Sequence, residues 1–324
     1  MSSIFTATTT APATVPSNRY YFFLLPSSRI IPWLEKRIYF ISKWWRMHSN
    51  GTSNKFITCY FSLALLIGGL GYAPWVLASY DLFPSDFFLV FMIVGGASPT
   101  IAAVIVARLE FGKKGGEYLF GQFGRKDFSK WWLFVPVLLP LTLATCAVLL
   151  WSITGEVYSL DLMKLAEFPA FLVANFLMNM WEEIGWRGYA LPALQEKHSA
   201  LISSLIVGIF WALWHWPHFV VKDSVMAANY HNFLWFTITV LLGSISYAWL
   251  YNSTNGSLFT VSLYHASTNA ATIILFVESG ISSSVFPFHF LTVLILAVIL
   301  VFAFKPNSLC RKKKVTLNQL QRDS

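Results

Sequence analysis

The sequence predicts an all-α polytopic membrane protein, and three observations support this fold class. Of its 324 residues, 56% are hydrophobic and only 12% are charged, against roughly a quarter charged in a soluble domain. The apolar residues gather in segments of about 20, the length that a helix needs to cross a bilayer. Aromatic residues are abundant, with 14 Trp, 13 Tyr and 29 Phe, and such residues form belts at membrane interfaces.

About eight segments are long and apolar enough to be transmembrane helices. Three of them are interrupted by Gly or Pro, at Gly95-Gly96 and Pro99, at Pro136 and Pro140, and at Pro217. Membrane helices tolerate such residues when they pack against neighbours. No internal repeat and no soluble domain is visible in the sequence. The predicted spans are about 56–78, 87–107, 131–153, 168–190, 201–220, 233–251, 257–277 and 286–304.

The chain therefore divides into an N-terminal tail at 1–55, a membrane domain at 56–304 and a basic C-terminal tail at 305–324. Residues 1–18 are rich in Ser, Thr, Ala and Pro and have no apolar core, so they do not form a signal peptide. Two interpretations of 1–34 stay open: an organelle transit peptide, or the simpler disordered cytoplasmic tail.

The basic residues predict the orientation. The chain has 23 Lys and Arg, and 20 of them are predicted on one side of the membrane: seven before the first span, six in 108–130, Lys197 after the fourth span, and six after the last span. Lys164 and Lys222 fall on the other side, and Arg187 lies within the fourth span. This asymmetry is a positive-inside signal that places both termini in the cytoplasm. It also explains the net charge of +8, which suits contact with an anionic inner leaflet. The bilayer is thus the expected partner, and nucleic-acid binding need not be invoked.

Three charges interrupt the fourth predicted span, in the stretch 181-WEEIGWRGY-189. Each ionised side chain at a helix centre costs about 2.5–3.5 kcal/mol on insertion, so such residues face the bundle interior and pair. Glu183 and Arg187 stand four residues apart and can form an ion pair. Glu182 is rotated from them by about 100° and is the freer carboxylate. The simplest alternative is that the three charges form a packing clamp between helices.

Two more polar clusters lie in other spans. His215 stands among aromatics in 210-FWALWHWPHF-219, and His265 and Asn269 share a helix face in 264-YHASTNAAT-272. A carboxylate can take a proton from water, and a neutral imidazole can shuttle a proton or bind a metal. Asn and His can also donate to a developing oxyanion. Together these residue types favour a catalytic site.

The order of these motifs resembles the CPBP family, which comprises the type II CAAX prenyl endopeptidases and the bacteriocin-processing or Abi proteins. The motifs are E-E-x-x-x-R at 182–187, aromatic-x-x-x-H at 211–215 and H-x-x-x-N at 265–269. The resemblance covers about 168–277, within an eight-helix CPBP-like membrane domain. One position departs from the family pattern, because Trp211 stands where a Phe is usual.

The resemblance implies an intramembrane endopeptidase that cuts near the cytoplasmic face. Its substrates would be prenylated CAAX-type proteins or other membrane-associated peptides. Glu182 would activate the water with the help of His215, and His265 and Asn269 would stabilise the oxyanion. Glu183 and Arg187 would be the structural ion pair, which agrees with their spacing.

Two mechanisms stay open for this site. The family is commonly described as metalloproteases, and Glu182, His215 and His265 would supply a two-His, one-carboxylate set for Zn²⁺ with room for a water. A metal-free mechanism, in which Glu and His alone activate the water, uses the same residues.

Two other functions compete with a protease. One is an immunity or scaffold protein that keeps the CPBP fold without essential proteolysis. The other is a proton-coupled transporter whose Glu and His relay protons. Transporters more readily show repeated halves with broken helices in corresponding positions, and this sequence shows no such symmetry.

Helix geometry raises one difficulty for this site. At 1.5 Å per residue, Glu182 and His265 lie roughly 12 Å from the cytoplasmic ends of their predicted helices, whereas His215 lies about 21 Å in. We expect the three to meet, so the fifth helix should begin later than 201 or tilt strongly. His289 is placed at the end of the last span and is given no role.

Overall fold

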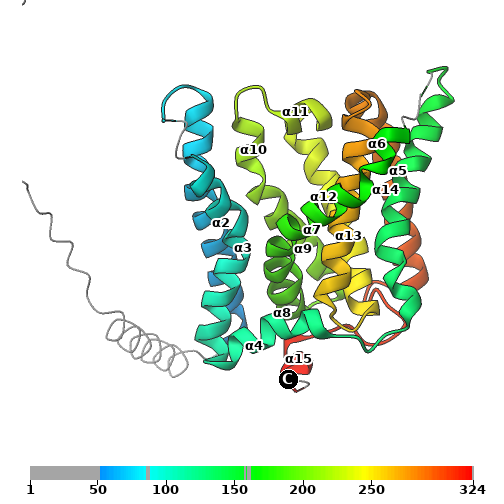
Figure 1. Ribbon diagram of the computed structural model, residues 1–324. Coiled ribbons are helices and arrows are strands. Elements are labelled where there is room, and N and C mark those ends of the chain that lie inside the picture. The colour runs from blue at the N-terminus through cyan, green and yellow to red at the C-terminus, as the bar shows by residue number, and fades with distance from the viewer. Residues whose placement is uncertain (1–51, 85–87, 157, 159–161, 323–324) are drawn as a thin grey trace, which may run out of the picture.

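The computed structural model describes residues 52–84, 88–156, 158 and 162–322, and no β-strand occurs in these ranges. Figure 1 shows a bundle of long helices joined by short turns. The α-helices are α2 (Thr52–Ser79), α3 (Phe88–Phe111), α4 (Lys114–Gly121), α5 (Val135–Ser152), α6 (Leu162–Ala166), α7 (Phe168–Gly185), α8 (Leu191–Gln195), α9 (Ala200–Trp214), α10 (Trp216–Val220), α11 (Val225–Tyr230), α12 (Phe233–Ser253), α13 (Leu258–Thr272), α14 (Ser282–Phe304) and α15 (Leu317–Arg322).

Helices occupy all eight segments that the sequence predicts as spans. By length and composition, five described helices could cross a membrane, namely α2 from Lys55, α3, α5, α12 and α14. The other three segments are helical runs with an irregularity: α7 joins α8 through the π-helical turn Trp186–Ala190, α9 is interrupted at His215 before α10, and α13 continues as the π-helical turn Ile273–Val277. The all-α polytopic fold class is confirmed, and the count of eight spans stays a prediction.

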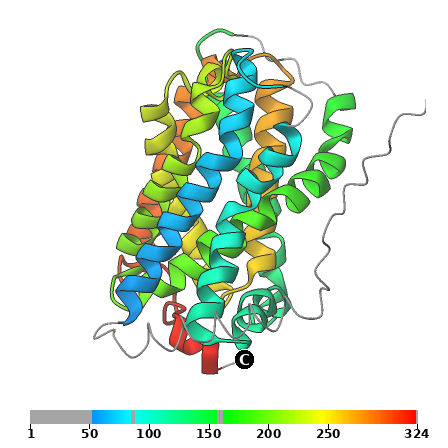
Figure 2. The same cartoon turned by 90° about the vertical axis from the view of Figure 1, so that its left-hand side faces the viewer.

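The helix α7, which carries the three charges, lies in the middle of the bundle. It packs against α3 on one side and α13 on the other, while α9 packs against α12. In both views α7 runs obliquely to the other long helices (Figures 1 and 2). Segments that are far apart in the sequence are thereby brought around Glu182 and Glu183.

The helix α3 fixes the position of α7. A Cβ on Gly185 would lie 2.5 Å from the carbonyl oxygen of Pro99, so only glycine permits this approach of the two helices. One turn away, the hydroxyl of Thr100 donates to the carbonyl of Trp181, the residue just before the glutamates. These contacts set the register of the segment that carries the charges.

The C-terminal tail lies beneath the turn between α12 and α13. The side-chain amides of Asn252 and Gln195 hydrogen-bond each other at 2.8 and 3.0 Å. The oxygen of Asn252 accepts from the backbone N–H of Val315, and its nitrogen donates to the carbonyl of Ser308. Thr254, in the turn itself, is fully buried. The N-terminal end of α13 is therefore not at the surface of the molecule.

The tail also encloses one of the three cysteines. Cys310 is buried, its Sγ lies 3.0 Å from the carbonyl oxygen of Lys312, and burial raises the pKa of its thiol. A buried thiol with a raised pKa is a poor nucleophile. Cys310 is thus a packing residue, although it stands beside a run of basic residues.

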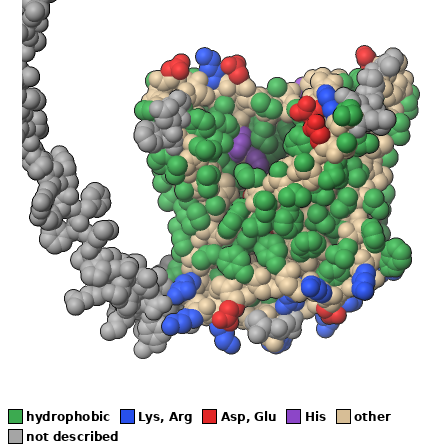
Figure 3. Space-filling view, viewed as in Figure 1, with side chains coloured by type: hydrophobic (Ala, Val, Ile, Leu, Met, Phe, Trp, Pro, Cys, Tyr) green, Lys and Arg blue, Asp and Glu red, His purple; other side chains and the backbone are tan. Residues whose placement is uncertain are grey.

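Charged side chains gather at the two ends of the bundle. In the face shown in Figure 3, Lys and Arg lie mostly at the end that carries α4, α8 and α15, and apolar side chains cover the middle. This distribution is the one that a positive-inside protein would show. The orientation of the termini stays a prediction.

Candidate active site

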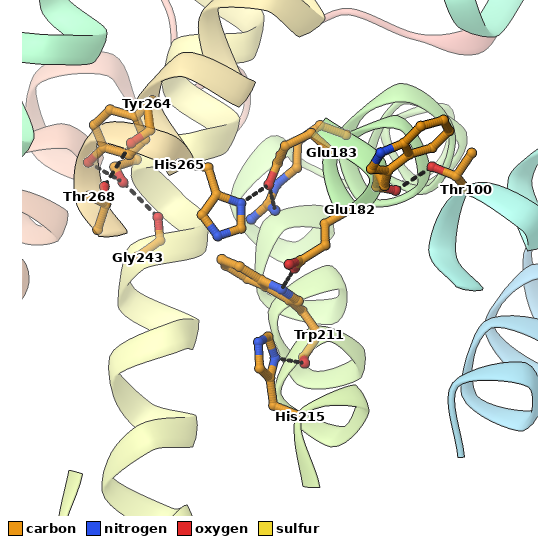
Figure 4. Close-up of polar contacts among 12 residues, drawn as sticks. Thr100, Glu182, Glu183, Trp211, His215, Gly243, Tyr264, His265 and Thr268 are labelled. Atoms are coloured by element: carbon orange, nitrogen blue, oxygen red, sulfur yellow. Dashed lines mark hydrogen bonds and ion pairs between the residues drawn. The ribbon is translucent and has the colours of Figure 1, made fainter. Parts of the chain in front are cut away.

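The three motifs converge in space, as Figure 4 shows. The indole Nε1 of Trp211 donates a hydrogen bond to Oε2 of Glu182 over 2.8 Å. The other carboxylate oxygen, Oε1, makes no hydrogen bond within the described part of the chain and is available as a base. Glu182 also lines the cavity described below. The freer of the two glutamates is therefore held by one oxygen and open at the other.

The second glutamate joins two other motif residues. Oε1 of Glu183 accepts from Nη1 of Arg187 at 3.0 Å and lies 2.8 Å from Nδ1 of His265. Glu183 and Arg187 are almost completely buried. The predicted ion pair is thus present, and it has a third member that spacing did not reveal. Because a carboxylate paired with arginine only accepts hydrogen bonds, Nδ1 of His265 carries a proton and donates it.

The last residue of this group, His215, is oriented by the backbone. Its Nδ1 lies 2.9 Å from the carbonyl oxygen of Trp211. A carbonyl can only accept, so Nδ1 is the donor, and in a neutral ring Nε2 then has a free lone pair. Trp211 therefore holds Glu182 through its side chain and His215 through its main chain.

Two aromatic rings cover the buried guanidinium. The Cζ of Arg187 lies 4.4 Å from the ring centroid of Trp211 and 4.1 Å from that of Tyr247. Such cation–π contacts stabilise a desolvated arginine by up to about 2 kcal/mol each. The ring of Trp211 also meets that of His265 edge to face, with centroids 5.3 Å apart. Trp211 is thus the residue common to all parts of the site.

The difficulty over depth is resolved by two features that the sequence did not show. The fifth predicted helix begins at Ala200 as expected, so the idea that it begins later is wrong. Instead, the run of α7 and α8 continues to Gln195, which places Glu182 roughly 20 Å from that end. The buried α12–α13 turn carries His265 inward as well. The expected distance of about 12 Å from Glu182 to the end of its own helical run is thereby corrected.

A cavity of about 170 Å³ adjoins these residues. One wall is polar and comes from α13, with His265, Thr268, Asn269 and Thr272. The apolar lining comes from α5, α12 and α14, which also supply Thr239, Ser246 and His289; it consists of Pro140, Leu143, Val240, Leu242, Val293 and Leu296. In Figure 3, imidazole side chains are visible at the floor of a hollow in the molecular surface.

His289 is a residue whose place the sequence analysis got wrong. The helix α14 begins at Ser282, four residues before the predicted span, so His289 lies inside it and not at its end. It is 92% buried and lines the cavity, and its Nδ1 has no hydrogen-bond partner among the described atoms. A polar residue in the last span could have signalled this position, because such residues are costly in membranes.

The proposed zinc ligands do not converge as a set. Among the described residues, no group of three His, Cys, Asp or Glu side chains is placed to hold a metal ion. The indole of Trp211 lies against both imidazoles and occupies one oxygen of Glu182. Zinc would require three ligands around one point at about 2.0–2.2 Å. This arrangement does not fit a zinc site, so no catalytic step is assigned to a metal here.

The part of the chain that holds the candidate site is similar in sequence to known proteins. Residues 164–271 match the family model of the type II CAAX prenyl endopeptidases, Rce1-like. The chain is also 24% identical over 211 residues to CAAX prenyl protease 2 of Methanococcus maripaludis, a match that covers 61% of this chain and 78% of that protein. The resemblance to the CPBP family is thereby confirmed.

A second relative matches a shorter part of the chain. Lysostaphin resistance protein A of Staphylococcus haemolyticus is 26% identical over 111 residues, which are 34% of this chain and 28% of that protein. All three sequence motifs lie within the Rce1-like segment, whose last residue, Ala271, follows Asn269 closely. The family likeness therefore supports a membrane protease.

Proposed function

We propose that this protein is an intramembrane endopeptidase in which Glu182 activates the attacking water. The observation that carries this proposal is the hydrogen bond from Trp211 to Oε2 of Glu182, because it fixes the carboxylate beside the cavity and leaves Oε1 free. A general base must lie within hydrogen-bond reach of the proton that it removes. His215 assists through its unprotonated Nε2, and the proton passes on to the leaving amine.

In this mechanism, side chains of α13 stabilise the oxyanion. The side-chain amide of Asn269 lines the cavity and can donate to the developing oxyanion. His265 can donate from Nε2 only when its ring is doubly protonated, because Nδ1 already donates to Glu183. Glu183 thus supports the positive charge of an imidazolium as well as that of Arg187.

The formal charges of the site bear on this mechanism. Two carboxylates, Glu182 and Glu183, face one guanidinium, Arg187, so a protonated His265 makes the cluster neutral. Burial of a net charge in a membrane is costly, whereas compensated groups persist. The proposed oxyanion donor is therefore also the group that balances the cluster.

The Rce1-like match and the relative named CAAX prenyl protease 2 support a proposal for the substrate class. We infer prenylated CAAX-type peptides, cut within the depth of the membrane. Wild-type protein in detergent should cleave a farnesylated CAAX peptide, and the Glu182→Gln variant should not. Cleavage by neither form of the protein would leave the immunity or scaffold function, which the match to lysostaphin resistance protein A favours.

A further inference from the structure

The candidate cavity adjoins a second hollow that opens toward the lipid. Leu143 of α5 and Leu296 of α14 line both hollows. The second has a volume of about 450 Å³, within the range of roughly 300–1,000 Å³ for ligand pockets. We call it the α5–α14 groove. Its other lining residues are Cys146, Leu149, Leu150, Thr292, Ile295 and Ile299.

The α5–α14 groove offers no polar group to a ligand. The hydroxyl of Thr292 donates to the carbonyl oxygen of His289 within its own helix. The methyl group of Thr292 is therefore the part of this side chain that a ligand in the groove would contact. Leu149, Ile295 and Ile299 are between 48% and 61% exposed. A chain lying in the groove would therefore touch hydrocarbon along its whole length and end among the lipid tails.

A smaller hollow adjoins the same cavity, and its lining is polar except for Phe276, Val277 and Phe286. It has about 50 Å³ and shares Tyr230, Thr272 and His289 with the candidate cavity. Asn229 and Ser282 complete its polar lining. The cavity beside Glu182 thus has one apolar extension, between α5 and α14, and one polar extension, which continues the polar wall of α13.

We propose that the α5–α14 groove receives the isoprenoid chain of the substrate, while the peptide that follows the scissile bond lies along α13 toward His289. This inference rests on the proposed function. A prenylated peptide has a hydrocarbon chain on one side of the cleaved bond and amide groups on the other, and the two extensions of the cavity that Glu182 lines present matching chemistries.

The groove acts on orientation and adds little affinity. Lipid tails are as apolar as leucine, so moving a hydrocarbon chain from the bilayer into the groove has little hydrophobic driving force. A fixed chain does hold the scissile bond in one place, and a displacement of about 1 Å can cost roughly 10²-fold in rate. Blocking the groove should therefore slow cleavage without releasing the substrate from the membrane.

The first test is photo-crosslinking to the wild-type, full-length protein in phospholipid nanodiscs. The probe is a farnesylated CAAX peptide whose isoprenoid chain ends in a diazirine. We expect crosslinks in 143–150 and 292–299, which an excess of unmodified farnesylated peptide removes. Crosslinks confined to other helices would overturn the proposal. Labelling that the peptide does not compete away would show that bulk lipid fills the groove, which also overturns it.

The second test compares two substitutions on α14. Leu296→Trp fills the junction between cavity and groove, and kcat/KM for the farnesylated peptide should fall at least tenfold with an unchanged melting temperature. Val298→Trp is the matched control, because Val298 is 45% exposed and lines neither hollow. Equal rates for the two variants would overturn the proposal. Cleavage of the peptide by the wild-type protein tests the proposed function separately from the groove. If Leu296→Trp misfolds, the crosslinking experiment still tests the groove.

Discussion

The indole nitrogen of Trp211 lies 2.8 Å from Oε2 of Glu182, so the carboxylate proposed as the base is held by a donor that phenylalanine, usual at this position in the family, does not have. Trp211→Phe keeps the ring against Arg187 and removes only the N–H. A hydrogen bond to a charged group contributes about 1.5–3 kcal/mol. We expect kcat to fall roughly tenfold or more, at 1.36 kcal/mol per tenfold, with KM nearly unchanged.

The control for this prediction is Trp249→Phe. Trp249 is buried in α12, and its Nε1 has no partner among the described residues. It lines neither the cavity nor the groove, so its loss of an N–H should leave kcat unchanged. If both variants behaved alike in steady-state kinetics, the hydrogen bond to Glu182 would have no part in catalysis.

Substitutions of the two adjacent glutamates should have different effects. Glu182→Gln keeps the side chain's shape but removes the base, so the rate should fall by roughly 10²-fold or more with little change in melting temperature. Glu183→Gln strands a buried Arg187, which can cost about 3–5 kcal/mol, so this variant should melt earlier. Melting curves and peptide cleavage rates of both variants check this. The roles are reversed if Glu182→Gln melts early while Glu183→Gln is stable and inactive.

The double variant Glu183→Gln with Arg187→Leu separates stability from activity. Neither charge is then stranded, so part of the stability lost in Glu183→Gln should return, since contacting residues are not additive. Activity should not return, because Nδ1 of His265 loses its carboxylate partner. A double variant that regains both would make Glu183 a purely structural residue.

The metal-free mechanism predicts that chelation leaves the rate intact. Protein dialysed against a strong chelator and shown by mass spectrometry to contain no zinc should cleave the farnesylated peptide at its original rate. The zinc mechanism predicts about one equivalent of metal, lost in His215→Ala and bound more weakly as the pH falls through the histidine range. Activity that returns only with added zinc would establish that mechanism instead.

The contact of α3 with α7 predicts a stability effect away from the chemistry. Gly185→Ala places a Cβ 2.5 Å from the carbonyl oxygen of Pro99, and such overpacking typically costs about 1–3 kcal/mol. Gly69→Ala is the control, because no heavy atom lies within 4 Å of its Cβ position. Thermal unfolding in one detergent should separate the two variants by several degrees, and equal midpoints would contradict the close packing.

The sequence predicted the helices and the Glu183–Arg187 ion pair, because both follow from local properties. Hydrophobic length places the spans, and a spacing of four residues pairs Glu183 with Arg187. Contacts between helices do not follow from spacing. The bond from His265 to Glu183, the indole bond to Glu182 and the inward placement of His289 each depend on how separate helices meet.

The predicted helix boundaries were wrong for the same reason. The helical run after Glu182 continues past the predicted end at 190 because the π-helical turn Trp186–Ala190 lets it go on into α8. Nothing in the local sequence marks such a turn. The burial of the α12–α13 turn also depends on residues of the tail, more than fifty positions away.

The buried amide of Asn252 bears on biogenesis. Asn252-Ser253-Thr254 is an acceptor sequence for N-glycosylation, yet its side-chain nitrogen donates to Gln195 and Ser308 in the folded protein. A bulky sugar at this nitrogen would expel the C-terminal tail. A cell that glycosylates its membrane proteins could therefore fold this chain only if the α12–α13 turn never entered the glycosylating compartment. This constraint on topology is independent of the count of basic residues.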